Sequence, residues 1–218
     1  SGRTFDYSAK ARLDAEGFGI LHSEIMLPAG APEWMADRQK LIDAIEARET
    51  RKDAQLFREI ELSLPRELTF EQQRDLVRAF VKSAFVSRGM VADVAIHDER
   101  ASDGGRNPHA HILLTMRELT ANGFGKKVRA WNAPALLKQW RETWAEMANE
   151  YLARYGHEKR IDHRSHAERG IDLEPDAYVG PKRSADFSGI IADARDEMRR
   201  AIKARNADQI RAKPETLL

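Results

Sequence analysis

The sequence has 218 residues, enough for one large domain or one domain with an appendage. Charged residues make up 33%, the mean hydropathy is −0.61, and no run of 18 apolar residues is present, so a membrane-inserted protein is not expected. Cysteine is absent, which excludes disulfides, thiolate metal sites and a cysteine nucleophile. Lys and Arg total 36 against 35 Asp and Glu, so the bulk charge indicates no polyanionic partner.

The beginning of the chain carries two further signals. The first twenty residues lack the apolar segment of a secretory signal, so a cytoplasmic protein is expected. The sequence starts with Ser1 rather than methionine. We therefore expect a fragment of a longer protein.

Hydrophobic periodicity predicts four strands and four helices. The order is strand, helix, strand, helix, strand, strand, helix, helix. In chain order these elements span residues 20–28, 32–49, 55–64, 69–88, 90–97, 109–116, 132–155 and 190–205. Polar, glycine-containing stretches predict loops at 98–108 and 120–131, and residues 157–188 predict an irregular arm. This order predicts an α+β fold with a central antiparallel sheet and helices mainly on one face.

Two segments carry sharper local signals. Thr69 followed by Gln72 is a capping-box pattern that predicts the start of the helix over 69–88. In the strand over 55–64, alternation places the leucines and Ile60 on one face and Glu59 and Glu61 on the other. The two acids therefore lie on the face away from the core.

Three of the seven histidines fall within fifteen residues, at the end of one predicted strand and the start of the next. His109 and His111 point to the same side of one strand, and an antiparallel neighbour would bring His97 alongside. Three neutral imidazoles suit a divalent cation that polarises a phosphoryl or carbonyl oxygen. The alternative is three strand-end histidines that only make hydrogen bonds. An HExxH helix is absent, which argues against a metalloprotease.

The segment NPHAHILLTMR, with His109 and His111, resembles the HUH nucleases and, more narrowly, plasmid mobilisation relaxases of the MobA/MobL type. The resemblance extends from about Gly2 to about Gly180, and the matching segments follow in the family's order. They are GRTFDYSAK, ILHSEIMLP, DAQLFREIELSLPREL, GMVADVAIHD, NPHAHILLTMREL and RIDHRSHAERGIDLEP. The resemblance implies a sheet like that of relaxases and rolling-circle initiators, with a ferredoxin-like core, in residues 1–188. Residues 189–218 would form a C-terminal helix and a linker, as in the N-terminal domain of a TraA-like relaxase.

The resemblance also implies an activity. Such relaxases nick one strand of plasmid DNA at an origin of transfer through a 5′-phosphotyrosine and rejoin it during conjugation. His97, His109 and His111 would hold one divalent metal, Mg or Mn in cells, with Mn, Co, Ni or Zn as further possibilities in crystals. The family's Arg-Glu pair corresponds to Arg58 and Glu59. Glu59 would orient a ligand imidazole or accept the tyrosine proton, and the alternative is a solvated acid or a partner for Arg58.

The implied partners are single-stranded or hairpin DNA at the transfer origin, accessory relaxosome proteins and a type IV coupling protein. Cations beside aromatic rings suit single-stranded DNA, because cations contact phosphates and rings stack on bases. The alternative for the predicted loop over 120–131 is a solubilising loop whose Trp131 docks on the core. His163 and His166 are not expected to be metal ligands, and His22 is expected to be structural. The candidate DNA contacts are Lys126, Lys127, Arg129, Trp131 and Arg164.

The sequence departs from the family at the nucleophile. Of its four tyrosines, Tyr151 and Tyr155 lie on the apolar stripe of a helix and are expected in the core, whereas Tyr178 lies in the arm. Tyr7 belongs to a segment that follows the nucleophile in the family. We therefore expect the nucleophile upstream of Ser1, with Tyr7 as the less favoured alternative. Other functions left open are a rolling-circle replication initiator or transposase of the same architecture, and a catalytically silent DNA-binding module.

Overall fold

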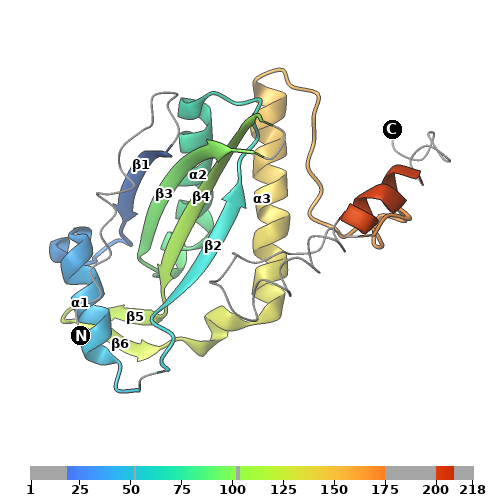
Figure 1. Cartoon of the computed structure of the whole chain (residues 1–218). Helices are drawn as coiled ribbons and strands as arrows, with labels where there is room; N and C mark the ends of the chain where they lie inside the picture. The colour runs from blue at the N-terminus through green and yellow to red at the C-terminus, as the bar shows by residue number, and fades with distance from the viewer. Residues whose placement is uncertain (1–18, 52, 102–103, 175–199, 209–218) are drawn as a thin grey trace, which may run out of the picture. The chain divides into compact units, whose positions relative to one another are not determined.

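The computed structural model describes residues 19–51, 53–101, 104–174 and 200–208 (Figure 1). The contacts divide the chain into two compact units, residues 1–162 and 163–218. The boundary predicted between residues 188 and 189 lies outside the described residues and stays a prediction. Within the described ranges, no helix combines the length and the apolar character that a membrane crossing requires.

Four antiparallel strands form the central sheet of the first unit. Their spatial order is β1-β3-β4-β2, so the two strands that carry the histidines lie in the middle of the sheet. The strands span β1 Gly19–Met26, β2 Phe57–Ser63, β3 Ala92–Arg100 and β4 Arg106–Thr115. The predicted α+β fold with a central antiparallel sheet is confirmed.

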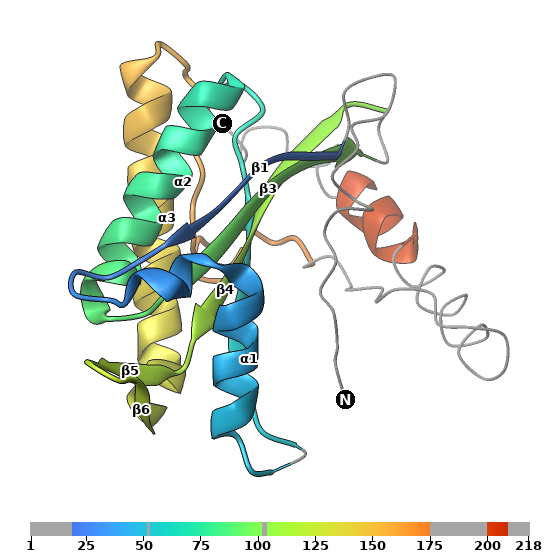
Figure 2. The same ribbon diagram turned by 90° about the vertical axis from the view of Figure 1, so that its left-hand side faces the viewer.

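Two long helices cover one face of this sheet, which we call the helix face. They are α2, Phe70–Ala84, and α3, Pro134–Arg154, and Figure 2 shows them together on one side of the strands. Phe80 of α2 makes edge-on ring contacts with Phe85 and Trp144, at centroid distances of 5.3 and 5.1 Å. The buried side chains that the sheet contributes to this core are Leu62, Ala92, Val94, Ile96, Ala110, Ile112 and Leu114.

The opposite face, which we call the histidine face, is covered at one end by α1, Arg38–Arg48. Leu41 and Ile45 of α1 pack with Val91 and Phe124 in a second, smaller core. At the start of α1, the Arg38 guanidinium makes two hydrogen bonds to the Asp93 carboxylate of β3, at 2.7 and 2.8 Å. The helices are therefore mainly, but not all, on one face, as predicted.

The helix starts follow the capping signals. The Thr69–Gln72 box is present: the Gln72 side chain accepts from the Thr69 backbone N–H at 2.9 Å, and the Thr69 hydroxyl accepts from the Gln72 N–H at 3.4 Å. The helix predicted from Pro32 was placed too early. A short 3-10 turn over Glu33–Ala36 comes first, and α1 begins after Asp37, whose side chain accepts from the Lys40 N–H at 3.1 Å.

Both predicted loops contain strand and were wrong in extent. The pairing of β3 with β4 continues to Arg100 and Arg106, so most of the stretch 98–108 belongs to a hairpin. The stretch 120–131 contains the turn and second strand of another hairpin, formed by β5, Arg117–Thr120, and β6, Gly123–Lys127. Polar strand ends carry no apolar alternation, and periodicity cannot distinguish them from loops.

Candidate metal centre

The strand register brings the three predicted histidines together on the histidine face. His97 on β3 lies directly opposite His109 on β4, and His111 follows two residues later on the same side of β4. The ring centroids are 5.4 Å apart for His97 and His109, and 5.1 Å apart for His111 and either of the others. His97 and His109 are buried, and His111 is partly exposed. The three imidazoles therefore surround one small volume.

Two of the three imidazoles are held in the tautomer that a metal ligand needs. His109 Nδ1 lies 2.7 Å from the Asn107 carbonyl oxygen, which only accepts, so Nδ1 carries the proton. His111 Nδ1 donates in the same way to Glu59 Oε1 at 2.9 Å. In the neutral form of either ring Nε2 then carries the lone pair, and a donor bond from the other nitrogen is the arrangement typical of metal-binding histidines. The donor set fits a divalent transition metal.

The sequence interpretation missed one further candidate ligand, Glu99. One potential ligand atom from each of His97, Glu99 and His109 lies within 4.8 Å of the others. Glu99 is exposed and follows His97 by two residues on β3, so strand alternation places both on the same face. The sequence does not reveal this, because the polar stretch from residue 98 onward predicts a loop rather than a strand. Among the described residues, Glu99 thus shares this close group of ligand atoms with His97 and His109, whereas His111 is near by its ring but outside the group.

The Arg58–Glu59 pair separates onto opposite faces of β2. The Arg58 guanidinium donates to the Trp131 carbonyl at 2.7 Å and lies 5.4 Å from the ring centroid of Trp140, on the helix face. Glu59 contacts His111 instead, as described above. Glu61 lies opposite His111 in the β2–β4 register. The contact of Glu59 with an imidazole is the geometry that an orienting residue requires.

The basic segment between β5 and α3 divides into structural and exposed side chains. Trp131 is 9% exposed and belongs to the main core. This agrees with the alternative in which its ring docks on the core instead of stacking on bases. Lys127 Nζ lies 3.0 Å from the Glu49 carboxylate and donates to the Gln55 carbonyl at 2.7 Å. Lys126 and Arg129 are exposed. The structure therefore leaves Lys126 and Arg129 at the surface, where a polyanion could meet them.

Glu49, at the end of α1, holds this segment through two cations. Its largely buried carboxylate lies 2.9 Å from Arg117 Nη2 and 3.0 Å from Lys127 Nζ. Burial alone would raise the pKa of Glu49, but hydrogen bonds and charge attraction from Lys127 and Arg117 outweigh it and lower the pKa. Ionised Glu49 therefore ties the β5–β6 hairpin to α1.

Glu49→Gln is expected to lower the free energy of unfolding by about 1.5–3 kcal/mol at pH 7, the range for hydrogen bonds to charged groups. Because the folded-state pKa is lowered, this contribution is present above about pH 4.3 and is lost as the pH falls through the lowered pKa. Urea unfolding from pH 7 to pH 3 should show the two proteins converging at low pH. The exposed Glu142 of α3 offers the control, Glu142→Gln. A stability difference that does not change with pH would refute this role of Glu49.

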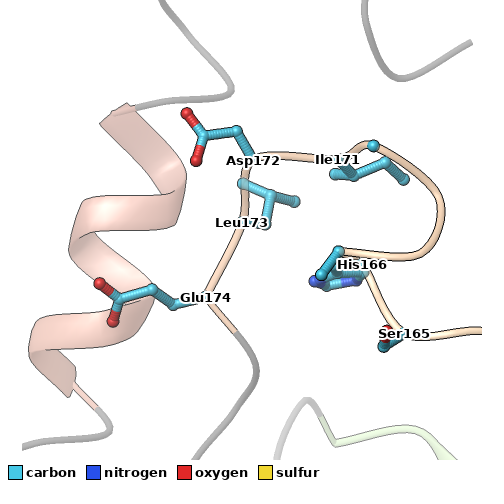
Figure 3. A pocket seen from close by; sticks show the side chains of 8 residues that line it. Ser165, His166, Ile171, Asp172, Leu173 and Glu174 are labelled. Carbon is cyan, nitrogen blue, oxygen red and sulfur yellow. The ribbon is translucent and has the colours of Figure 1, made fainter.

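The remaining residues that the sequence analysis considered as DNA contacts or metal ligands lie in the second unit. Arg164 is exposed there, and His163 and His166 are partly buried. His166 lines a pocket of about 490 Å³, and all the residues around it come from 165–174 (Figure 3). Glu174, which also lines this pocket, accepts a 2.6 Å hydrogen bond from Arg205 of the helical segment 200–208. Among the residues that the structure describes, neither histidine belongs to a group of three potential metal ligands.

The tyrosines fall into two groups. Tyr7 and Tyr178 lie outside the described residues. Tyr151 packs against the main core, as predicted, with the Arg154 guanidinium 5.0 Å from its ring centroid. Tyr155 follows the last residue of α3 and is 41% exposed, so its predicted place in the core was wrong. Tyr151 lies in α3 and Tyr155 directly after it, and this helix packs on the helix face, away from the three imidazoles.

Curated proteins are similar to this chain in sequence. Among curated relatives, a conjugal transfer protein TraA of Agrobacterium fabrum is 37% identical, over 82% of this chain and 18% of that protein. A mobilization protein MobL of Acidithiobacillus ferridurans is also 37% identical, over 83% of this chain and 53% of that protein. The chain thus spans from under a fifth to about half the length of these two relatives.

Solved structures resemble the fold as well. A structure described as the molecular basis of vancomycin resistance transfer in Staphylococcus aureus matches with a TM-score of 0.63 and 32% identity, over 73% of this chain and 79% of that one. The conjugative relaxase TrwC in complex with oriT DNA matches with a TM-score of 0.50 and 12% identity, over 87% of this chain and 90% of that one, and so shares the fold. The family model described as MobA/MobL matches residues 1–186. The chain therefore belongs to the MobA/MobL family.

Proposed function

We propose that this chain is the strand-transferring domain of a DNA relaxase, which nicks plasmid DNA at an origin of transfer and rejoins it during conjugation. The observation that carries the proposal is the meeting of three imidazoles on one face of the sheet in a member of this family. The names of the relatives, conjugal transfer and mobilization proteins, support the same process. The oriT DNA bound to the structural neighbour TrwC supports DNA as the partner.

The proposed chemistry is transesterification at a phosphate. His97, His109 and His111, together with Glu99, would hold one divalent metal, Mg or Mn in cells, and the bound ion would supply charge neutralisation at a phosphate oxygen. Glu59 would fix the orientation of His111 through the hydrogen bond to Nδ1. The chain's own contribution is therefore to position and orient the donors before DNA arrives.

The proposed nucleophile is a tyrosine upstream of Ser1 in the natural protein, with Tyr7 as the alternative. Tyr151 and Tyr155 do not suit this role, because α3 packs on the face of the sheet opposite to the imidazoles. Lys126, Arg129 and Arg164 are the proposed contacts to DNA phosphates, since all three are exposed. We also propose relaxosome proteins and a type IV coupling protein as partners, and the cytoplasm as the location.

A covalent-capture assay tests this function. A labelled single-stranded oligonucleotide containing the transfer origin is incubated with Mn²⁺ and three proteins: this chain, the chain extended upstream with its natural residues, and Tyr7→Phe. We expect covalent capture by the extended protein only, whereas this chain binds the oligonucleotide without cleaving it. A replication-origin hairpin serves as the control substrate.

The other outcomes are informative. Cleavage by this chain that Tyr7→Phe abolishes would assign the nucleophile to Tyr7. Preferred cleavage of the replication-origin hairpin would indicate a rolling-circle initiator. Binding without capture by the extended protein, at any Mn²⁺ concentration, would refute the enzyme and leave a DNA-binding module.

A further inference from the structure

Asp98 is a buried carboxylate that follows the first histidine of the cluster, His97, on β3. Its side chain faces the side of the sheet opposite to the histidines. Only 4% of this side chain is exposed. One carboxylate oxygen accepts a hydrogen bond from the Arg106 side chain, and the other accepts from the backbone N–H of Asn107 at 3.1 Å. Both donors belong to the first two residues of β4. Asp98 therefore ties the start of β4 to β3.

This tie lies beside a proline of β4. Asp98 pairs in register with Pro108. The Pro108 carbonyl points to the other neighbour and accepts from the Leu64 N–H beyond the end of β2, at 2.9 Å. The hydrogen bond from Asn107 to the Asp98 carboxylate adds a link between β3 and β4 one residue before the proline. A side chain thus supplements the backbone ladder at this point.

Asn107 connects this tie to the candidate metal centre. Its N–H is fixed by Asp98, and its carbonyl accepts from His109 Nδ1 at 2.7 Å. A shift of Asn107 would move or break the bond that keeps the proton on Nδ1 of His109. The other nitrogen of that ring, Nε2, would then lose its defined lone pair and its direction.

We propose that Asp98 is a positioning residue, which holds Asn107 so that its carbonyl fixes the tautomer and orientation of His109. This inference rests on the proposed function only in taking the site to bind a metal. The fixed tautomer of His109 is a property of the protein without metal. Asp98 itself faces away from the three imidazoles and touches neither metal nor DNA in this role.

Asp93 provides a matched control on the same strand. It is also a buried carboxylate of β3 with an arginine partner, Arg38, at 2.7 and 2.8 Å. Its partner belongs to α1, at the end of the sheet away from the histidines. Removing Asp93 deletes a similar buried ion pair without touching Asn107. Removal of Asp93 therefore distinguishes a general loss of stability from a loss of the position of Asn107.

The test uses nitrogen-15 NMR of the histidine rings in the metal-free protein, together with Mn²⁺ binding by calorimetry. In the wild type, His109 should be the Nδ1–H tautomer. Asp98→Ala should give a mixture of tautomers at His109 and weaken Mn²⁺ binding by about 10–100-fold, the range for changes in the outer contacts of metal ligands. Asp98→Asn should restore both readings, because the amide oxygen can still accept from Asn107. Asp93→Ala should leave both unchanged.

Asp98→Thr is a second variant that suits a strand and keeps one oxygen in place of two, in case Asp98→Ala does not fold. It should shift the tautomer in the same direction by a smaller amount. An unchanged Nδ1–H tautomer and unchanged Mn²⁺ affinity in the folded Asp98 variants would overturn the proposal. If the wild type itself failed to bind Mn²⁺, the proposed function would fail, while the tautomer reading would still decide the role of Asp98.

Discussion

Replacing His109 and His111 together by alanine is expected to abolish Mn²⁺ binding. The two residues supply two of three imidazoles whose ring centroids lie 5.1–5.4 Å apart, so the double variant leaves only His97 and the exposed Glu99. The loss of affinity should exceed the roughly 10–100-fold that changes in the outer contacts of metal ligands cause, because the ligands themselves are removed. Isothermal calorimetry with Mn²⁺ measures it directly.

His22→Ala is the control for this experiment. His22 lies on β1, and its Nε2 atom makes a 3.0 Å contact with Glu24, which also pairs with Arg78 of α2 on the helix face. This variant should keep the Mn²⁺ affinity of the wild type. Thermal unfolding of both metal-free variants shows whether they remain folded. Mn²⁺ affinity that is retained in the folded double variant would contradict the assignment of the site.

Phe80→Ala is expected to cause the largest loss of stability of any single change considered. Phe80 is 1% exposed and lies in α2 between the rings of Phe85 and Trp144. Removing a buried aromatic ring costs its transfer free energy and leaves a cavity, together about 3–5 kcal/mol. This range already includes the loss of the two edge-on ring contacts. Urea unfolding followed by circular dichroism measures the free energy of unfolding.

The same helix supplies a surface control. Lys82 is exposed on α2, so Lys82→Ala should change the free energy of unfolding by less than about 0.5 kcal/mol. Phe80→Leu keeps most of the buried volume and should cost less than Phe80→Ala. A loss of under about 1 kcal/mol for Phe80→Ala would show that α2 does not hold the sheet as the contacts indicate.

The strands and helices with apolar periodicity could be predicted from the sequence, and the polar ones could not. Alternation marks a strand only where one face is buried, as in β2 with Leu62 inward and Glu61 outward. The ends of β3 and β4 and the β5–β6 hairpin carry polar residues and glycines on both faces. Their pairing depends on tertiary contacts, such as Asp98 with Arg106 and Glu49 with Arg117. Such contacts between distant residues leave no local pattern.

The candidate site shows the same division. Strand alternation predicts that His109 and His111 share a face, and hairpin pairing predicts that His97 joins them; the structure brings all three together. The sequence gives the charge of Lys127 but not its partner, so the contact with Glu49 had to come from the structure. Trp131 likewise suits a base-stacking ring or a core residue by composition alone, and the structure places it in the core.

The proposed metal site lies between His97, His109 and His111. Anomalous diffraction from a crystal of the protein grown with Mn²⁺ tests it most directly. The account predicts one anomalous peak within bonding distance of an imidazole nitrogen of His97 and of the Nε2 atoms of His109 and His111. A fully occupied Mn²⁺ peak elsewhere, or no peak at these imidazoles at saturating Mn²⁺, would contradict it.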